Sequence, residues 1–226
     1  MKKIKFYTEA VYIIGLALIA FGAALTTKSD FGISMVIAPA YLISLKVSEY
    51  ISFFTFGMAE YLIQGLIIVF MMIIIRKFRF SYLISFLTAV IYGSMLDGFL
   101  VVLDLIPIST PARIVFYVSG LLLTAFGVAM MFKTYISPEA YELFVKEISN
   151  KYNLDISKFK TYYDCVSCLI SIILSFLFFG FGKFVGINVG TIISALLSGR
   201  LIGIFSKFLD NKFNFVDKFK FRYIFE

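Results

Sequence analysis

Four ionisable residues stand inside long apolar stretches of this sequence: Glu60, Asp97, Asp164 and Arg200. Placing such a group in the hydrocarbon core of a membrane costs about 2.5–3.5 kcal/mol on insertion scales, so it normally faces the protein interior and has a partner. A buried carboxyl group can carry a proton, and a guanidinium can hold an anionic group. These four residues are therefore candidates for a substrate or ion site.

Other kinds of chemistry have little support in the sequence. The chain has no His, which removes the commonest general base and metal ligand. Cys165 and Cys168 form a CxxC within an apolar stretch, and we expect buried packing residues there rather than zinc ligands. We therefore expect no enzyme, no cofactor and no bound metal.

The composition indicates an integral membrane protein. The 226 residues are 61% hydrophobic and 15% charged, with a mean hydropathy of +0.95, whereas a soluble domain is about 25% charged. Nucleic-acid binding is not expected, since basic residues in a membrane chain mark cytoplasmic loops and anionic headgroups. Six apolar segments are each long enough to cross a bilayer: 10–27, 51–75, 80–103, 114–132, 162–182 and 184–207.

The segment 31–45 is also apolar but too short for an upright span, and we expect a re-entrant or interfacial helix; the alternative is a seventh, tilted span. Segment 135–160 is charged and suggests a cytoplasmic amphipathic helix and loop. With both ends of the chain in the cytoplasm, the outer segments hold few basic residues: Lys28, Lys46, Arg113 and Lys183.

The chain contains an internal repeat. Residues 12–28 align with residues 117–133 at an offset of 105, and Tyr, two Gly and a closing Lys recur in register. Glu60 then corresponds to Asp164, and 93–104 corresponds to 199–210. We predict an all-α membrane bundle in a single domain, 1–226, made of repeats 7–104 and 112–210 with a basic aromatic interfacial tail, 211–226. Three spans per half is an odd number, so the halves would have opposite orientations, as in many secondary transporters.

Depth along the spans groups the charged residues into two predicted clusters. These are either gates or a proton and ion path, or else structural salt bridges. The outer cluster comprises Lys28, Glu60 and Asp97, with Gln64 one turn further along the second span. The inner cluster comprises Lys133, Asp164 and Arg200. Asp97 and Arg200 lie at different depths, so we expect no direct pair between them.

Two turns add further binding candidates. Asn188, Gly190 and Thr191 open the sixth span, and a helix N-terminus suits an anionic group; a plain helix cap is the alternative. Gly32 and Ser34 follow the first span, at the place where Ser137 and Pro138 follow the fourth, and broken helices at corresponding positions point to a binding site.

These glycine-containing turns resemble the YitT/YczE-like family of small bacterial membrane proteins. The similarity rests on residues 15–28 and 31–34, on Ser137-Pro138, and on Gly190-Thr191 with Gly199. The chain departs from the family pattern at Met35, where Pro is expected, and at Asn188, where Gly is expected. The resemblance implies a bacterial inner-membrane location and transfers no substrate.

Taken together, the sequence predicts a secondary transporter or permease for a small polar or anionic metabolite. The alternative is a non-transporting scaffold or accessory subunit, whose partner would be a membrane protein or another copy of the chain. Flux that depends on Arg200 and Glu60 would favour the first.

Overall fold

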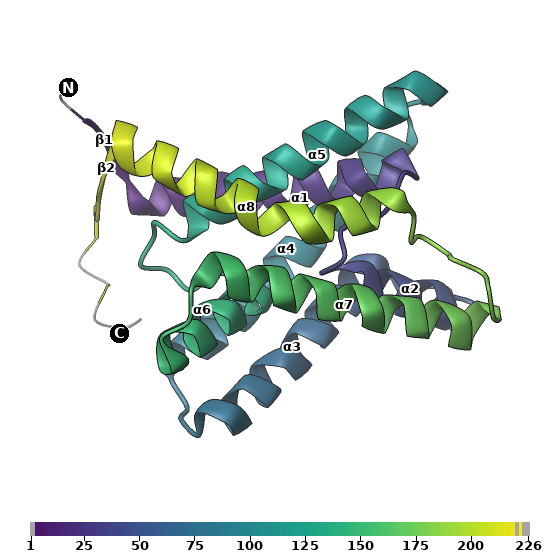
Figure 1. Ribbon diagram of the computed structural model, residues 1–226, viewed down its shortest axis with the longest axis horizontal. Coiled ribbons are helices and arrows are strands. Elements are labelled where there is room, and N and C mark those ends of the chain that lie inside the picture. The colour runs from purple at the N-terminus through teal and green to yellow at the C-terminus, as the bar shows by residue number, and fades with distance from the viewer. Residues whose placement is uncertain (1–2, 220–221, 223–226) are drawn as a thin grey trace.

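The computed structural model describes residues 3–219 and 222, which form eight helices and two short strands (Figure 1). Six of these helices are long and apolar enough to cross a membrane: α1 (Thr8–Ser29), α3 (Phe56–Ile75), α4 (Phe80–Asp104), α5 (Thr110–Met131), α7 (Ile156–Phe179) and α8 (Val189–Lys212). Two helices are short: α2 (Ala38–Ser48) and α6 (Ala140–Tyr152). The strands are β1 (Ile4–Tyr7) and β2 (Phe213–Val216). The predicted polytopic bundle with six spans is confirmed, and the chain is a multi-pass membrane protein.

Several helix ends differ from the prediction because polar caps decide them. The second span begins at Phe56 rather than 51, where the Thr55 hydroxyl accepts a hydrogen bond from the Met58 N–H at 3.1 Å. The fifth begins at Ile156 rather than 162, since Asp155 caps the Lys158 N–H at 2.8 Å. The sixth begins at Val189 rather than 184, after a loop in which three glycines have positive φ.

The segment 31–45 contains none of the six helices that are long enough to cross a membrane. It forms a turn followed by α2, whose 11 residues reach only about 16 Å. Strand β1 pairs in parallel with β2, so the segments before the first span and after the sixth lie on the same face of the molecule. An even number of crossings satisfies this pairing and a seventh span does not.

The helices pack as two groups (Figure 1). In the first group α1 lies between α4 and α5, and α5 packs against α8. In the second group α2 and α6 each pack against both α3 and α7. The groups are joined where α3 packs on α4 and α7 packs on α8.

Glycines bring α1 and α5 into backbone contact. A Cβ built on Gly15 would stand 3.1 Å from the Gly127 carbonyl oxygen, and one built on Gly22 would stand 2.7 Å from the Gly120 carbonyl oxygen. As numbering rises along α1 it falls along α5, so the two helices are antiparallel. Small residues at such a crossing allow the close packing that associates helices in lipid.

The amphipathic helix expected within 135–160 is present as α6, but several of its charged residues are buried rather than solvated. One of its faces is buried, including Glu142, Leu143 and Val145, and Glu139 just before it is only 2% exposed. The buried charges are tolerated because α3 and α7 supply partners, described below. Helices α2 and α6 therefore occupy similar places in the two halves of the chain, which their sequences do not reveal.

The predicted interfacial tail, 211–226, is in part a strand. Residues 213–216 form β2, and the Glu9 carboxylate accepts hydrogen bonds from the backbone N–H groups of Lys218 and Phe219. These contacts tie the segment to the start of α1 rather than leaving it to rest on lipid alone. Residues 220–221 and 223–226 of the predicted tail lie outside the described residues.

Candidate solute-binding cavity

A cavity lies between the two helix groups, with a volume of about 50 Å³. Helices α1, α4, α5 and α8 line one side of it, and α6, α7 and the turn at 34–37 line the other. Much of the wall is aliphatic, formed by Ile19, Val36, Ile37, Leu121, Val128 and Ile202. Its polar groups include Tyr92, Thr124, Glu139, Glu142, Lys160, Asp164, Ser194 and Ser198. A cavity that combines an apolar wall with convergent polar groups is typical of a small-molecule site.

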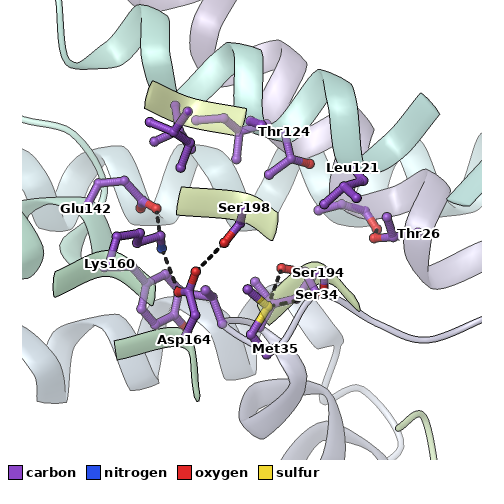
Figure 2. Close-up of a pocket in the computed structure, with 18 of the residues that line it drawn as sticks. Thr26, Ser34, Met35, Leu121, Thr124, Glu142, Lys160, Asp164, Ser194 and Ser198 are labelled. Atoms are coloured by element: carbon purple, nitrogen blue, oxygen red, sulfur yellow. Dashed lines mark hydrogen bonds and ion pairs between the residues drawn. The ribbon is translucent and has the colours of Figure 1, made fainter. Parts of the chain in front are cut away.

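A chain of charged contacts crosses one end of the cavity (Figure 2). The Lys160 ammonium lies 3.1 Å from a carboxylate oxygen of Glu142 and 3.1 Å from one of Asp164. Asp164 also accepts a hydrogen bond from the Ser198 hydroxyl. Lys160 and Asp164 are four residues apart on α7 and so share one face of that helix. The contacts connect α6, α7 and α8.

A second polar network joins α3 to the start of α6. The Gln64 side-chain carbonyl accepts a hydrogen bond from the Ala140 N–H at 3.0 Å, which satisfies a free donor of the helix end. Its amide group donates to Glu139 at 3.2 Å and to Glu60 at 3.4 Å. The Tyr141 hydroxyl donates to Glu60 at 3.1 Å. One glutamine therefore links two buried carboxyl groups to a helix N-terminus.

The buried charges do not balance. Among the described residues, the buried acidic side chains are Glu60, Glu139, Glu142 and Asp164, and the one buried base is Lys160. Burial raises the pKa of Glu139 well above its usual range, and the neighbouring Glu142 and Glu60 raise it further. The Glu139 carboxyl group therefore keeps its proton to a higher pH than an exposed glutamate does, unless a positive charge binds beside it.

The predicted charged clusters form different pairs. Lys28 bonds to Asp104 at 2.7 Å rather than to Glu60 or Asp97, because it lies at the C-terminal end of α1 beside the C-terminal end of α4. Lys133 bonds likewise to Asp210 at 2.7 Å. Asp97 accepts the Gly57 backbone N–H at 2.9 Å where α4 crosses α3.

Arg200 lies outside the cavity. Its side chain is on the exposed side of α8 among apolar residues such as Leu197 and Ile204, whereas Asp164 is buried. Within the described chain no ion pair joins Arg200 to Asp97 or Asp164. The expected inner cluster of Lys133, Asp164 and Arg200 is therefore wrong, and Lys160 takes the place predicted for Arg200.

The start of α8 packs against the turn that follows α1, and hydrogen bonds join the two. The Gly190 N–H donates to the Phe31 carbonyl at 3.1 Å, and the Asn188 side chain donates to the Asp30 carbonyl at 3.1 Å. A Cβ on Gly32 would stand 2.5 Å from the Thr191 nitrogen. These contacts support the alternative of a helix cap with tight packing over the predicted anion site. Of the turn residues, Ser34 does line the cavity.

Sequence reasoning missed Glu139, Glu142, Lys160 and Tyr92. Two signals were available: Lys160 precedes Asp164 by four residues, and Glu139 follows Ser34 by 105, the repeat offset. The expectation of two buried cysteines was half wrong, since Cys168 is buried but Cys165 is exposed.

Comparisons with known proteins bear on the family. No curated protein and no solved structure matched the chain. The sequence model of one family matches residues 6–207, which include the first five spans, most of α8 and every residue of the cavity. The chain therefore belongs to the family of unknown function DUF6198.

Proposed function

We propose that this protein is a secondary transporter for a small polar metabolite, working by alternating access between two inverted halves. The observation that carries the proposal is the charged cavity between the two helix groups, lined by side chains from both halves of the chain. A solute site at the interface of two repeats is the usual arrangement in such transporters.

Pairs of equivalent contacts support the inversion. Lys28–Asp104 joins α1 to α4, and Lys133–Asp210 joins α5 to α8, with each pair separated from the other by the repeat offset. Because α1 and α5 are antiparallel, these ion pairs belong to opposite ends of the bundle. Equivalent bonds at opposite ends favour two states of similar energy, one opening at each face.

The residues around the cavity favour a neutral or positively charged solute over an anion. Arg200 is exposed on α8, and the Gly190 N–H already bonds to Phe31. The similarity of the turns to the YitT/YczE-like family supports a bacterial inner-membrane location, and the distribution of basic residues supports cytoplasmic termini.

The test is metabolite profiling of cells and medium for the wild type and Asp164→Asn at matched membrane abundance. Arg200→Gln serves as the control, because it removes one charge at an exposed site of α8. We expect a metabolite to be displaced across the membrane by the wild type and by Arg200→Gln, but not by Asp164→Asn. No displacement by the wild type over a broad panel would contradict transport and favour the scaffold alternative.

A further inference from the structure

Several buried polar atoms at the cavity lack hydrogen-bond partners among the described residues, and two of them belong to Glu139 and Tyr92. Within residues 3–219 and 222, no hydrogen bond reaches the second carboxyl oxygen, Oε1, of Glu139 or the Tyr92 hydroxyl. Glu139 is 2% exposed and Tyr92 is 0% exposed, and both line the cavity. A buried polar group without a hydrogen-bond partner destabilises the protein, so each atom is a place where a ligand gains affinity.

The surroundings of Glu139 are acidic and aromatic. The titratable groups that act on it or face the same space are Glu60 from α3, Tyr92 from α4, Tyr12 from α1, Tyr141 and Glu142 from α6, and Lys160 and Asp164 from α7. Lys160 already bonds to Glu142 and Asp164. Glu139 and Glu60 are left with only the neutral partners Gln64 and Tyr141. Glu139 therefore has no cationic partner of its own, and a positive charge placed beside it could pair with this group once its proton has left.

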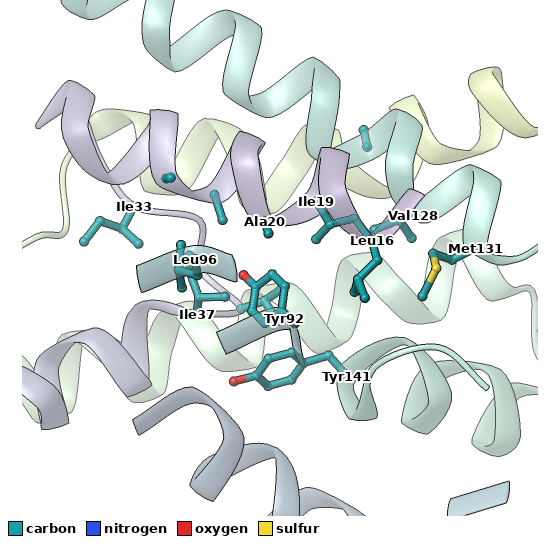
Figure 3. Packing of buried hydrophobic residues seen from close by; sticks show 14 of the residues in the cluster. Leu16, Ile19, Ala20, Ile33, Ile37, Tyr92, Leu96, Val128, Met131 and Tyr141 are labelled. Carbon is teal, nitrogen blue, oxygen red and sulfur yellow. The ribbon is translucent and has the colours of Figure 1, made fainter. Parts of the chain in front are cut away.

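The ring of Tyr92 lies beside that of Tyr141, beneath Leu16 and Ile19 of α1 (Figure 3). Both tyrosines line the cavity, and aromatic faces attract cations. The aliphatic wall opposite suits an alkyl group rather than a bare metal ion. A volume of about 50 Å³ restricts the ligand to a few non-hydrogen atoms.

We propose that the cavity binds a small protonated alkylamine in exchange for a proton held by Glu139. The ammonium N–H groups would donate to Glu139 Oε1 and to the Tyr92 oxygen. In the exchange the O–H bond of the Glu139 carboxyl group breaks, its proton passes to water, and the carboxylate pairs with the ammonium. The charge of the cavity does not change, because one positive charge replaces another. This inference names the solute class of the proposed transporter and so rests on that proposal, but binding can be tested without transport.

The test uses the full chain in detergent, in weak buffer with a pH-sensitive dye, titrated with methylammonium chloride and, separately, with sodium chloride. We expect roughly one proton released per methylammonium bound, since each charge replaces one proton. Sodium chloride at the same concentration should release far less. Equal release by the two salts, or none by methylammonium, overturns the proposal.

Variants locate the exchange. Glu139→Gln should abolish proton release, because the amide side chain has no acidic proton to release. Tyr92→Phe removes only a hydroxyl with no hydrogen-bond partner in the described chain, so it should leave folding intact and weaken methylammonium binding about tenfold. The control is Glu49→Gln, an acid on the surface that pairs with Lys46. Unchanged binding in Tyr92→Phe together with unchanged release in Glu139→Gln overturns the proposal.

Vesicle experiments separate this inference from the transporter proposal. Proton release on binding without methylammonium uptake into proteoliposomes contradicts transport and supports the binding site. Uptake of another solute by a protein that releases no proton to methylammonium supports transport and overturns the amine site.

Discussion

Gly22 on α1 and Gly120 on α5 lie in mutual backbone contact. A Cβ built on Gly22 would stand 2.7 Å from the Gly120 carbonyl oxygen, and one built on Gly120 would stand 2.6 Å from that of Gly22. Neither helix can accept a methyl group here without moving away from the other. This crossing lies within the helix group that forms one wall of the cavity, so its spacing determines the shape of the site.

Replacing Gly22 by Ala should destabilise the protein by about 1–3 kcal/mol, since the added methyl group overpacks a backbone contact. The measurement is thermal unfolding by circular dichroism in a fixed detergent. Gly98→Ala is the matched control in α4, where no atom lies within 4 Å of the added Cβ, and it should be neutral or stabilising by about 1 kcal/mol. Similar losses of stability in both variants would show that the close α1–α5 contact is not the reason why Gly22→Ala destabilises the protein.

Opposite orientation of the two halves predicts opposite accessibility for Asp104 and Asp210. After Cys165 and Cys168 are replaced by Ser, an impermeant maleimide should label Asp104→Cys in intact cells and Asp210→Cys only after permeabilisation. Both aspartates are partly exposed ends of ion pairs, with side-chain exposures of 68% and 55%, so reagent can reach them. Labelling of both residues from the same side would rule out inverted halves.

Removing the Lys160 ammonium should strongly destabilise the protein. Lys160→Met leaves Glu142 and Asp164 buried without their shared cation, and breaking a buried pair in this way costs about 3–5 kcal/mol. The triple variant Lys160→Met, Glu142→Gln, Asp164→Asn should regain most of that loss, because no charge is left unpaired. Lys158→Met, an exposed neighbour on α7, should change stability by less than about 0.5 kcal/mol. A triple variant no more stable than Lys160→Met would contradict the electrostatic explanation.

Glu139 should make stability depend on pH. The pKa of this carboxyl group is 4.5 in its ordinary state and is raised in the folded protein by burial, Glu142 and Glu60. Its stabilising contribution is therefore fully present below pH 4.5. It is lost as the pH rises toward the folded-state pKa, because the unfolded chain releases the proton and the folded protein keeps it. Unfolding temperatures measured from about pH 4 to about pH 8 should fall less steeply in Glu139→Gln than in the wild type. Parallel curves would show that Glu139 is ionised in the folded protein.

The spans were predictable from sequence because the length of an apolar segment can be compared directly with the thickness of the hydrocarbon core that a helix must cross. Their ends were less predictable, since single capping groups such as Thr55 and Asp155 decide them. Tyr, Gly and Lys recur between residues 12–28 and 117–133 in the sequence, and the glycines among these form the contact surface of α1 and α5.

The charged partners were not predictable, because position along a span gives depth but not direction around the helix. Depth placed Arg200 near Asp164, whereas the turn of α8 directs Arg200 outward and Ser198 inward. The burial of the charged residues at α6 was not predictable for a related reason. Glu139 and Glu142 suggest a solvated surface until the positions of Gln64 and Lys160, far away in sequence, are known. Asp164 and Glu60 are buried, as expected of ionisable residues within spans, but their partners differ from the predicted ones.

During synthesis β1 emerges before α1, whereas its partner strand β2 emerges only after α8. The backbone N–H and C=O groups of Ile4–Tyr7 therefore stay unpaired with β2 until all six spans have been synthesised. Pairing then joins the segment before the first span to the segment after the sixth. A paired β1 marks a molecule whose insertion is finished, and an open β1 marks one that is still being assembled.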